Sequence, residues 1–211
     1  MTAHVAVAQM PAIPVIPGNA QATAQLAAII DAARAQNLPV DPIIGKVNYA
    51  LLRVHARADT VLSTARGVAA RLSVARDALA PRANALDIAQ AEEALSFHVS
   101  REIITRIRAA SNEQSIAVPL GTLTQLVASH IDANRAAEIV LSLVKRGATS
   151  QQLADFGTNV NTDVMSGGRP DEALAIRMRF LTAALAPAAG HQGTGDLLNG
   201  SVPGPARPPK P

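Results

Sequence analysis

The chain has 211 residues, of which 48% are hydrophobic, 17% are charged and only 2% are aromatic, and it contains no Cys and no Trp. The absence of Cys excludes disulfide bonds, thiolate zinc sites, iron–sulfur clusters and a cysteine nucleophile. The formal net charge of +3 is modest for this length, so charge alone gives little reason to expect a nucleic-acid partner. Ala makes up roughly a fifth of the residues, well above ordinary usage.

The first 18 residues form an apolar segment that three prolines interrupt: Pro11, Pro14 and Pro17. Proline at this spacing cannot lie inside a helix, so residues 1–18 are predicted to form an extended lead. The tripeptide Ala6-Val7-Ala8 before Gln9 matches a signal-peptidase site, but only five residues precede it and none is basic. Two interpretations stay open: a chance match in an Ala-rich chain, or the remnant of a signal peptide. Export and a cytoplasmic location are therefore equally supported.

Helical periodicity then accounts for nearly all of residues 19–186, which we predict to form one domain. About eight helices are expected: near 20–36, from Pro42, about 60–80, about 85–110, around 120–127, around 136–145, from Ser150, and from about 171 to 185. The chain breaks at Asn37, His55, His130, Gly147 and Gly168. No stretch alternates like a strand, and none approaches the roughly 18 apolar residues of a membrane helix. The predicted fold is all-α, with antiparallel helical hairpins in a bundle or a short solenoid-like array.

Two of these helices carry the expected core. A coiled-coil-like seam over residues 61–79 consists of Val61, Ala65, Val68, Leu72, Ala75 and Leu79. Gly67 lies inside it and should cost about 1 kcal/mol relative to Ala. Residues 85–110 have apolar residues on two faces and are predicted to be the longest, central helix. The few aromatic residues are expected at buried positions: Tyr49, Phe97, Phe156 and Phe180.

Local capping signals support these boundaries. Asn37 suits a left-handed position after the first helix, and Asp41 is predicted to cap the next helix ahead of Pro42. Thr149 and Gln152 have the spacing of a capping box. The domain ends near residue 186, and residues 187–211, rich in Gly and Pro, are predicted to be a disordered tail.

Short turns such as Asn37-Leu38-Pro39 and Lys145-Arg146-Gly147 separate the helices of this Ala- and Arg-rich chain. In these features the chain resembles uncharacterised all-helical bacterial proteins that are exported. The resemblance implies an all-helical fold in an exported bacterial protein, and it brings no known activity with it.

Few side chains suggest chemistry. His55 and His130 lie at predicted helix ends, where capping of terminal carbonyls is favoured over a functional site. His98 and Glu102 are one helical turn apart, but no further ligands accompany them, so a solvated pair is favoured over a metal site. Glu93 lies on an apolar face and is expected to pair with an arginine of the same helix rather than act in acid–base chemistry. The candidate arginines are Arg101, Arg106 and Arg108.

The chain has no nucleophile elbow, no phosphate-binding loop and no dinucleotide-binding motif. We therefore expect no enzymatic activity, no cofactor and no metal site. The leading hypothesis is a non-enzymatic interaction or structural protein of a bacterium. A partner helix could bind the exposed part of the 61–79 seam, or the tail could offer a polyproline ligand at Pro205 to Pro208. Self-burial of the seam and plain disorder of the tail are the competing interpretations.

The alternative function is DNA binding. Residues 123–147 are similar to a helix-turn-helix of winged-helix regulators, with a short helix, a turn at His130 to Asp132 and a longer helix ending in a basic residue and Gly. The residues that would face DNA are Asn134, Arg135, Ser142 and Lys145. Glu138 on the same face would oppose phosphate, and a further helix follows Gly147 where a wing would need a hairpin.

Overall fold

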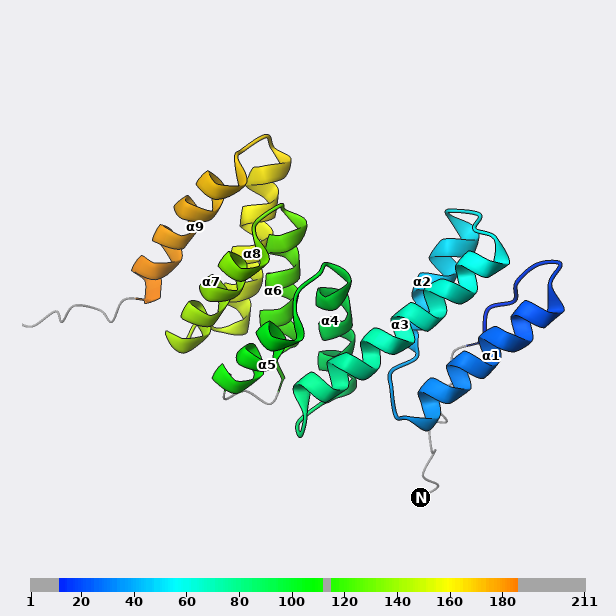
Figure 1. Cartoon of the computed structure of the whole chain (residues 1–211). Coiled ribbons are helices and arrows are strands. Elements are labelled where there is room, and N and C mark those ends of the chain that lie inside the picture. Colours follow the sequence, from blue (N-terminus) through cyan, green and yellow to red (C-terminus); the bar gives the residue numbers. More distant parts are fainter. Residues whose placement is uncertain (1–11, 112–114, 186–211) are drawn as a thin grey trace, which may run out of the picture.

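The computed structural model describes residues 12–111 and 115–185, and this part of the chain is all-α, as predicted, with nine helices and no strand (Figure 1). The helices are α1 (Ala20–Ala35), α2 (Asp41–Leu52), α3 (Ala58–Leu79), α4 (Ala85–Ser96), α5 (Arg101–Ala110), α6 (Ala117–Ala128), α7 (Ala133–Lys145), α8 (Ser150–Met165) and α9 (Pro170–Leu185). The Ala6-Val7-Ala8 motif, the tail 187–211 and its Pro205 to Pro208 segment lie outside the described residues.

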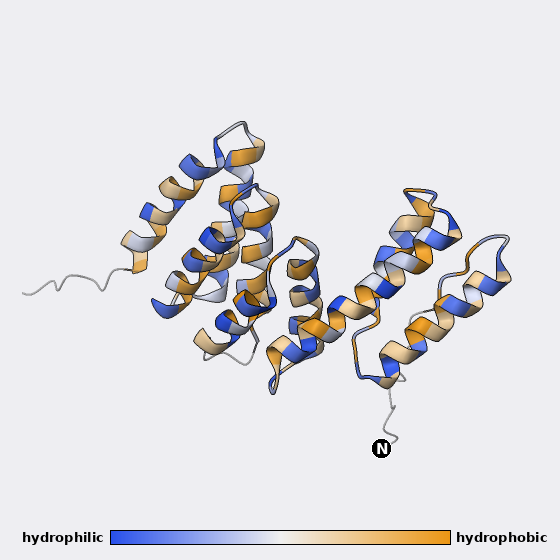
Figure 2. Cartoon of the chain, viewed as in Figure 1, coloured by the Kyte–Doolittle hydropathy of each residue, from blue (hydrophilic) through white to orange (hydrophobic). Residues whose placement is uncertain are grey.

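The helices form a solenoid-like array of two rows (Figure 1). In the odd row α1, α3, α5 and α7 pack side by side, and in the even row α4, α6 and α8 do the same. Helix α2 packs on α3, and α9 packs on α8 at the other end of the array; we count α2 with the even row and α9 with the odd row. Each helix alternates hydrophobic and hydrophilic residues along its length (Figure 2), so the apolar stripes meet between the rows.

A common turn ends five of the helices. A residue with positive φ follows the helix, its N–H donates to the carbonyl three residues back, and the next N–H donates to the carbonyl five residues back. This is the Schellman motif, which satisfies carbonyls that a helix end leaves without partners. The residues with positive φ are Asn37, His98, His130, Gly147 and Gly167. The first four are followed by a buried apolar residue, such as Val99 after His98.

The predicted breaks at Asn37, His55, His130 and Gly147 are confirmed, because each has a positive φ. His55 follows α2 with a looser turn, in which the N–H of Ala56 donates to the carbonyl of Ala50. In the last break the positive φ belongs to Gly167 rather than Gly168.

The prediction of one long helix over residues 85–110 is wrong. The chain leaves the helix after Ser96, and His98 takes a φ of 63°. Val99 is buried, and the Ser100 hydroxyl accepts the N–H of Ile103 at 3.4 Å to begin α5. A left-handed residue, an apolar residue and a capping residue thus break a segment that contains neither Gly nor Pro.

The central helix is instead α3, which has 22 residues and contacts α1, α2, α4 and α5. The complete 61–79 seam is fully buried in these contacts. Self-burial of the seam is therefore confirmed, and the hypothesis that a partner binds its exposed part is wrong, because none of it is exposed.

The aromatic residues do not form the core. Phe156 is 4% exposed as predicted, but Phe97 is 38%, Tyr49 64% and Phe180 69% exposed. Phe97 is left outside because the chain turns at that residue, directly after α4. The core consists, apart from Phe156, of aliphatic side chains from all nine described helices and the turns between them. Its largest fully buried members are Leu26, Ile30, Ile43, Leu72, Leu79, Ile104, Ile107, Ile116, Leu120, Leu123, Leu126 and Leu143.

The two predicted caps have different outcomes. Thr149 and Gln152 form the expected capping box at the start of α8. Asp41 does not cap α2: it is the first helical residue, and the preceding Val40 makes no side-chain cap. A carboxylate in the first turn still interacts favourably with the helix dipole.

Candidate functional site

The residues predicted to face DNA all lie on α7, and part of that face is occupied. Asn134, Arg135 and Lys145 are exposed, and Ser142 is partly buried. Arg135 forms an ion pair with Asp171 at the start of α9. Glu138 pairs with Arg106 of α5 at 2.5 Å. Helix α8 follows Gly147 in the place of a wing. The DNA-binding alternative stays a prediction that these contacts do not favour.

His98 and Glu102, the candidate metal ligands, do not lie on one helix. His98 lies in the turn between α4 and α5, whereas Glu102 lies in the first turn of α5. The backbone N–H of Glu102 and the Ser100 hydroxyl hold the pKa of the Glu102 carboxyl below its ordinary value. Within residues 12–111 and 115–185, no three His, Asp or Glu side chains gather as metal ligands would.

On helix α4, the carboxylate that pairs with an arginine is Glu92 and not Glu93. Glu93 forms no ion pair with any described residue, while its neighbour Glu92 is 1% exposed and pairs with Arg71 of α3. The Oε1 atom of Glu92 lies 2.9 Å from Nε and 2.7 Å from Nη2 of Arg71. The expected pairing of Glu93 with Arg101, Arg106 or Arg108 is therefore wrong. The break after Ser96 moves those arginines onto another helix, and one residue along α4 is a rotation of about 100°.

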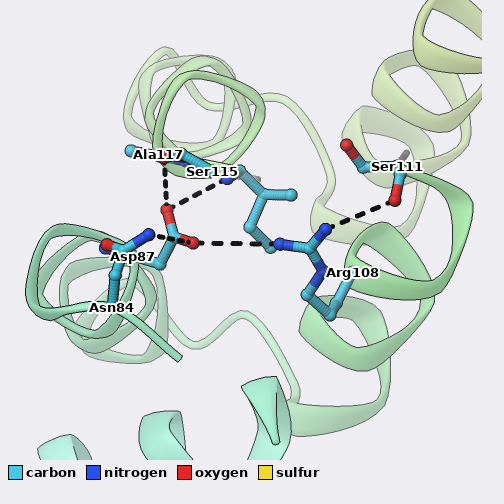
Figure 3. A network of polar contacts seen from close by, with 7 residues as sticks. Asn84, Asp87, Arg108, Ser111, Ser115 and Ala117 are labelled. Carbon is cyan, nitrogen blue, oxygen red and sulfur yellow. Dashed lines mark hydrogen bonds and ion pairs between the residues drawn. The ribbon is translucent and has the colours of Figure 1, made fainter. Parts of the chain in front are cut away.

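A second buried carboxylate, Asp87, holds the junction of α4, α5 and α6 together (Figure 3). Its Oδ1 accepts hydrogen bonds from the Ser115 hydroxyl at 2.6 Å and from the N–H of Ile116 at 3.0 Å. Its Oδ2 accepts Nδ2 of Asn84 at 2.9 Å and lies 3.8 Å from Nη1 of Arg108. Figure 3 shows the carboxylate between these groups, with Arg108 extending on to Ser111.

Asp87 is 0% and Arg108 9% exposed, and a buried charge is tolerated only when it is paired and hydrogen-bonded. Both carboxylate oxygens of Asp87 are in contact with donors of the protein itself. This carboxylate therefore holds helices together and offers no access to a substrate.

The charges of the helices divide between the two rows. The even helices carry one cation, Lys46, and six carboxylates: Asp41, Asp87, Glu92, Glu93, Asp155 and Asp163. The odd helices carry eleven cations: Arg34, Arg66, Arg71, Arg76, Arg101, Arg106, Arg108, Arg135, Lys145, Arg177 and Arg179. The even row thus presents a face almost free of cations.

That even-row face contains two adjoining hollows. One, of about 410 Å³, lies over α6 and is lined by Leu86, Gln90 and Glu93 of α4, by Gly121 and Gln125 of α6 and by residues of α8. The absence of a side chain at Gly121 leaves room for Gln90, whose Oε1 would be 3.3 Å from a Cβ at that position. Leu86 is 60% exposed at its edge.

The second hollow, of about 540 Å³, separates α2 from α4. It is lined by Gly45, Lys46 and Tyr49 of α2 and by Gln90 and Glu93 of α4, which also line the first hollow. A Cβ at Gly45 would meet nothing within 4 Å. We call the two hollows together the even-row groove. Apolar surface with a few converging polar groups is typical of binding sites.

No known protein family, curated protein or solved structure matches this chain. Among the described residues no helix is long and apolar enough to cross a membrane. The interpretation of the even-row groove therefore rests on its own residues. Sequence reasoning missed this groove, because its lining comes from four helices. The one signal available was the near absence of Lys and Arg from the segments that form the even row.

Proposed function

We propose that this chain is a non-enzymatic interaction protein that binds a polypeptide partner along the even-row groove. The observation that carries the proposal is a hollowed face on which Tyr49 and Leu86 are 64% and 60% exposed beside the polar side chains of Gln90 and Glu93. Large hydrophobic side chains left in water next to a few polar groups are typical of docking surfaces.

The rest of the structure supports this use of the even row. Asp87 and Glu92 are already bound to other groups of the protein. The polar side chains in the groove that can contact a partner include Gln90, Glu93 and Gln125. Stacked helical hairpins hold their core between the rows and leave an extended outer face for a partner. The fold can therefore accept a ligand without rearranging its core.

A photo-crosslinking amino acid placed at Gln90 in the native cell tests the proposal. We expect a discrete adduct with one protein, because Gln90 lies where the two hollows meet. The same amino acid at Arg66, exposed on α3, serves as the control on the odd row. Gly45→Leu should reduce the Gln90 adduct several-fold, because the new side chain fills the hollow, while a Cβ there meets no neighbour.

An adduct that forms from Arg66 but not from Gln90 would place the interface elsewhere and reject the proposal. An adduct at Gln90 that Gly45→Leu leaves unchanged would exclude the α2–α4 part of the groove. An adduct with the mass of two chains would identify the partner as a second copy.

A further inference from the structure

The hollow between α2 and α4 holds the single tyrosine of the chain. Tyr49 leaves 64% of its surface in solvent, although burial of an aromatic ring is favourable. An exposed ring in a groove is the surface on which proline-rich segments dock, because proline rings pack flat on it. Arginine and lysine can also lie over such a ring.

One carboxylate of the hollow, Glu93, is placed to interact with a basic occupant. Glu93 is partly exposed and forms no ion pair with any described residue, unlike the buried Glu92 beside it. Lys46 is the one cation among the residues that line the hollow, and Glu92 and Glu93 are its two carboxylates. A ligand that combines proline with positive charge therefore suits both Tyr49 and Glu93.

The chain itself contains such a segment. Residues 203–211 read Pro-Gly-Pro-Ala-Arg-Pro-Pro-Lys-Pro, with five prolines, two cations and no Asp or Glu. The two cations, Arg207 and Lys210, are three residues apart. That spacing is one turn of a polyproline II helix, so both would lie on the same side of the segment.

The length of the connection permits docking within one chain. Helix α9 ends at Leu185, and residues 186–202 separate it from the proline-rich segment. At about 3.3–3.6 Å per residue, these seventeen residues span up to about 55–60 Å. Helix α9 packs on α8, α8 on α6 and α6 on α4, whose residues line the hollow, so three steps of about 8–10 Å lead across the helices from α9 to the hollow. The connection is about twice as long as this path.

We propose that residues 203–211 dock in the hollow between α2 and α4 of the same chain, with prolines against Tyr49 and a cation beside Glu93. The inference rests on the proposed function, because it makes this segment an internal competitor of the partner for the even-row groove. It assigns the groove a ligand class, namely a basic, proline-rich polypeptide.

Energy transfer within the full chain tests the docking. Tyr49 is the only tyrosine and the chain lacks Trp and Cys, so Ala206→Cys labelled with a dansyl group makes one donor–acceptor pair. We expect transfer that does not depend on protein concentration. Arg207→Glu/Lys210→Glu should lower it roughly two-fold or more, because like charges then meet at the hollow. Glu93→Gln and Gly45→Leu should lower it as well.

The matched control is Arg146→Glu/Arg179→Glu, which reverses two exposed cations far from the C-terminal segment in sequence and should leave the transfer unchanged. Transfer that rises with protein concentration would show docking on a second copy and overturn the assignment to the same chain. Equal transfer in the wild type and all variants would overturn the inference entirely. The crosslink from Gln90 to an outside partner does not need the C-terminal segment, so the proposed function can succeed where this inference fails.

Discussion

The two rows of helices differ in which charges they carry and in how they use them. Three ion pairs join neighbouring helices of different rows, and in each one the even helix supplies the carboxylate and the odd helix the arginine: Asp87–Arg108, Glu92–Arg71 and Asp163–Arg177. Pairs within the odd row, such as Arg106–Glu138, use both signs from that row. The even row therefore keeps its outer face nearly free of cations.

Pairing odd-helix arginines with even-helix carboxylates joins the two rows, and it also leaves few cations on the even helices. Arginine has a long stem, so it can reach from an odd helix into the space between the rows and keep its charge there. Short carboxylates on α4 meet it without leaving the even row. The groove on the outer side of the even row then contains one cation, Lys46, among mostly uncharged residues and the carboxylate of Glu93.

The largest expected effect comes from removing the buried carboxylate of the even row. Asp87→Ala should lower the free energy of unfolding by about 3–5 kcal/mol, because the buried charge of Arg108 loses its carboxylate and the donors of Asn84, Ser115 and Ile116 lose their acceptor. Chemical denaturation measures this change. Asp155→Ala, at an exposed carboxylate of α8, is the matched control and should change stability by less than about 0.5 kcal/mol. A loss at Asp87 as small as that of the control would contradict a structural role.

At the C-terminal end of the array, Phe156 and Phe180 differ in burial. Phe156 of the even helix α8 is 4% exposed, whereas Phe180 of the odd helix α9 is 69% exposed. Phe156→Ala should therefore cost about 3–5 kcal/mol, and Phe180→Ala less than about 1 kcal/mol. Thermal unfolding of the two variants measures both values. Similar losses would show that α9 buries more than the structure indicates.

A glycine of the central odd helix should be replaceable with a gain. Gly67→Ala is expected to raise the free energy of unfolding by roughly 0.5–1 kcal/mol, because Ala loses less backbone entropy in a helix. The new Cβ would lie 3.5 Å from Nη1 of Arg71, an ordinary contact. Denaturant titration measures the gain. A destabilised variant would indicate that the Cβ disturbs the Arg71–Glu92 pair.

The smallest expected effect concerns the partly buried pair between α8 and α9. Arg177 donates two hydrogen bonds of 2.7 Å to Asp163 and holds the pKa of that carboxyl below its ordinary value of 3.8. A depressed carboxyl pKa stabilises the fold above the unfolded pKa, and this contribution is lost as pH falls through the folded pKa. Asp163→Asn should therefore flatten the decline of the melting temperature below about pH 4. An unchanged acid limb would contradict the role of this pair.

Local signals predicted much of the fold. Asn37, Thr149 and Gly147 were identified from residue type and spacing, because capping depends on a few neighbouring atoms. The turn after α4 was missed, although His98-Val99-Ser100 follows the same order of left-handed, apolar and capping residues as His130-Ile131-Asp132. Neither turn contains Gly or Pro, and His is one of the few other residues that take a left-handed conformation readily. At His98 the four-residue spacing of Leu95, Val99 and Ile103 continues across the turn and indicates an unbroken helix.

The sequence by itself determined the all-α fold, most of the helices and the seam of α3, because periodicity, capping and composition act over single segments. Only the tertiary structure decided that Glu92 and not Glu93 is buried, that Tyr49 stays exposed, and that α2, α4, α6 and α8 share one face. These properties depend on which helices become neighbours. A residue's spacing tells which way it points from its own helix, and the packing partner decides whether that direction leads into the core or into a groove.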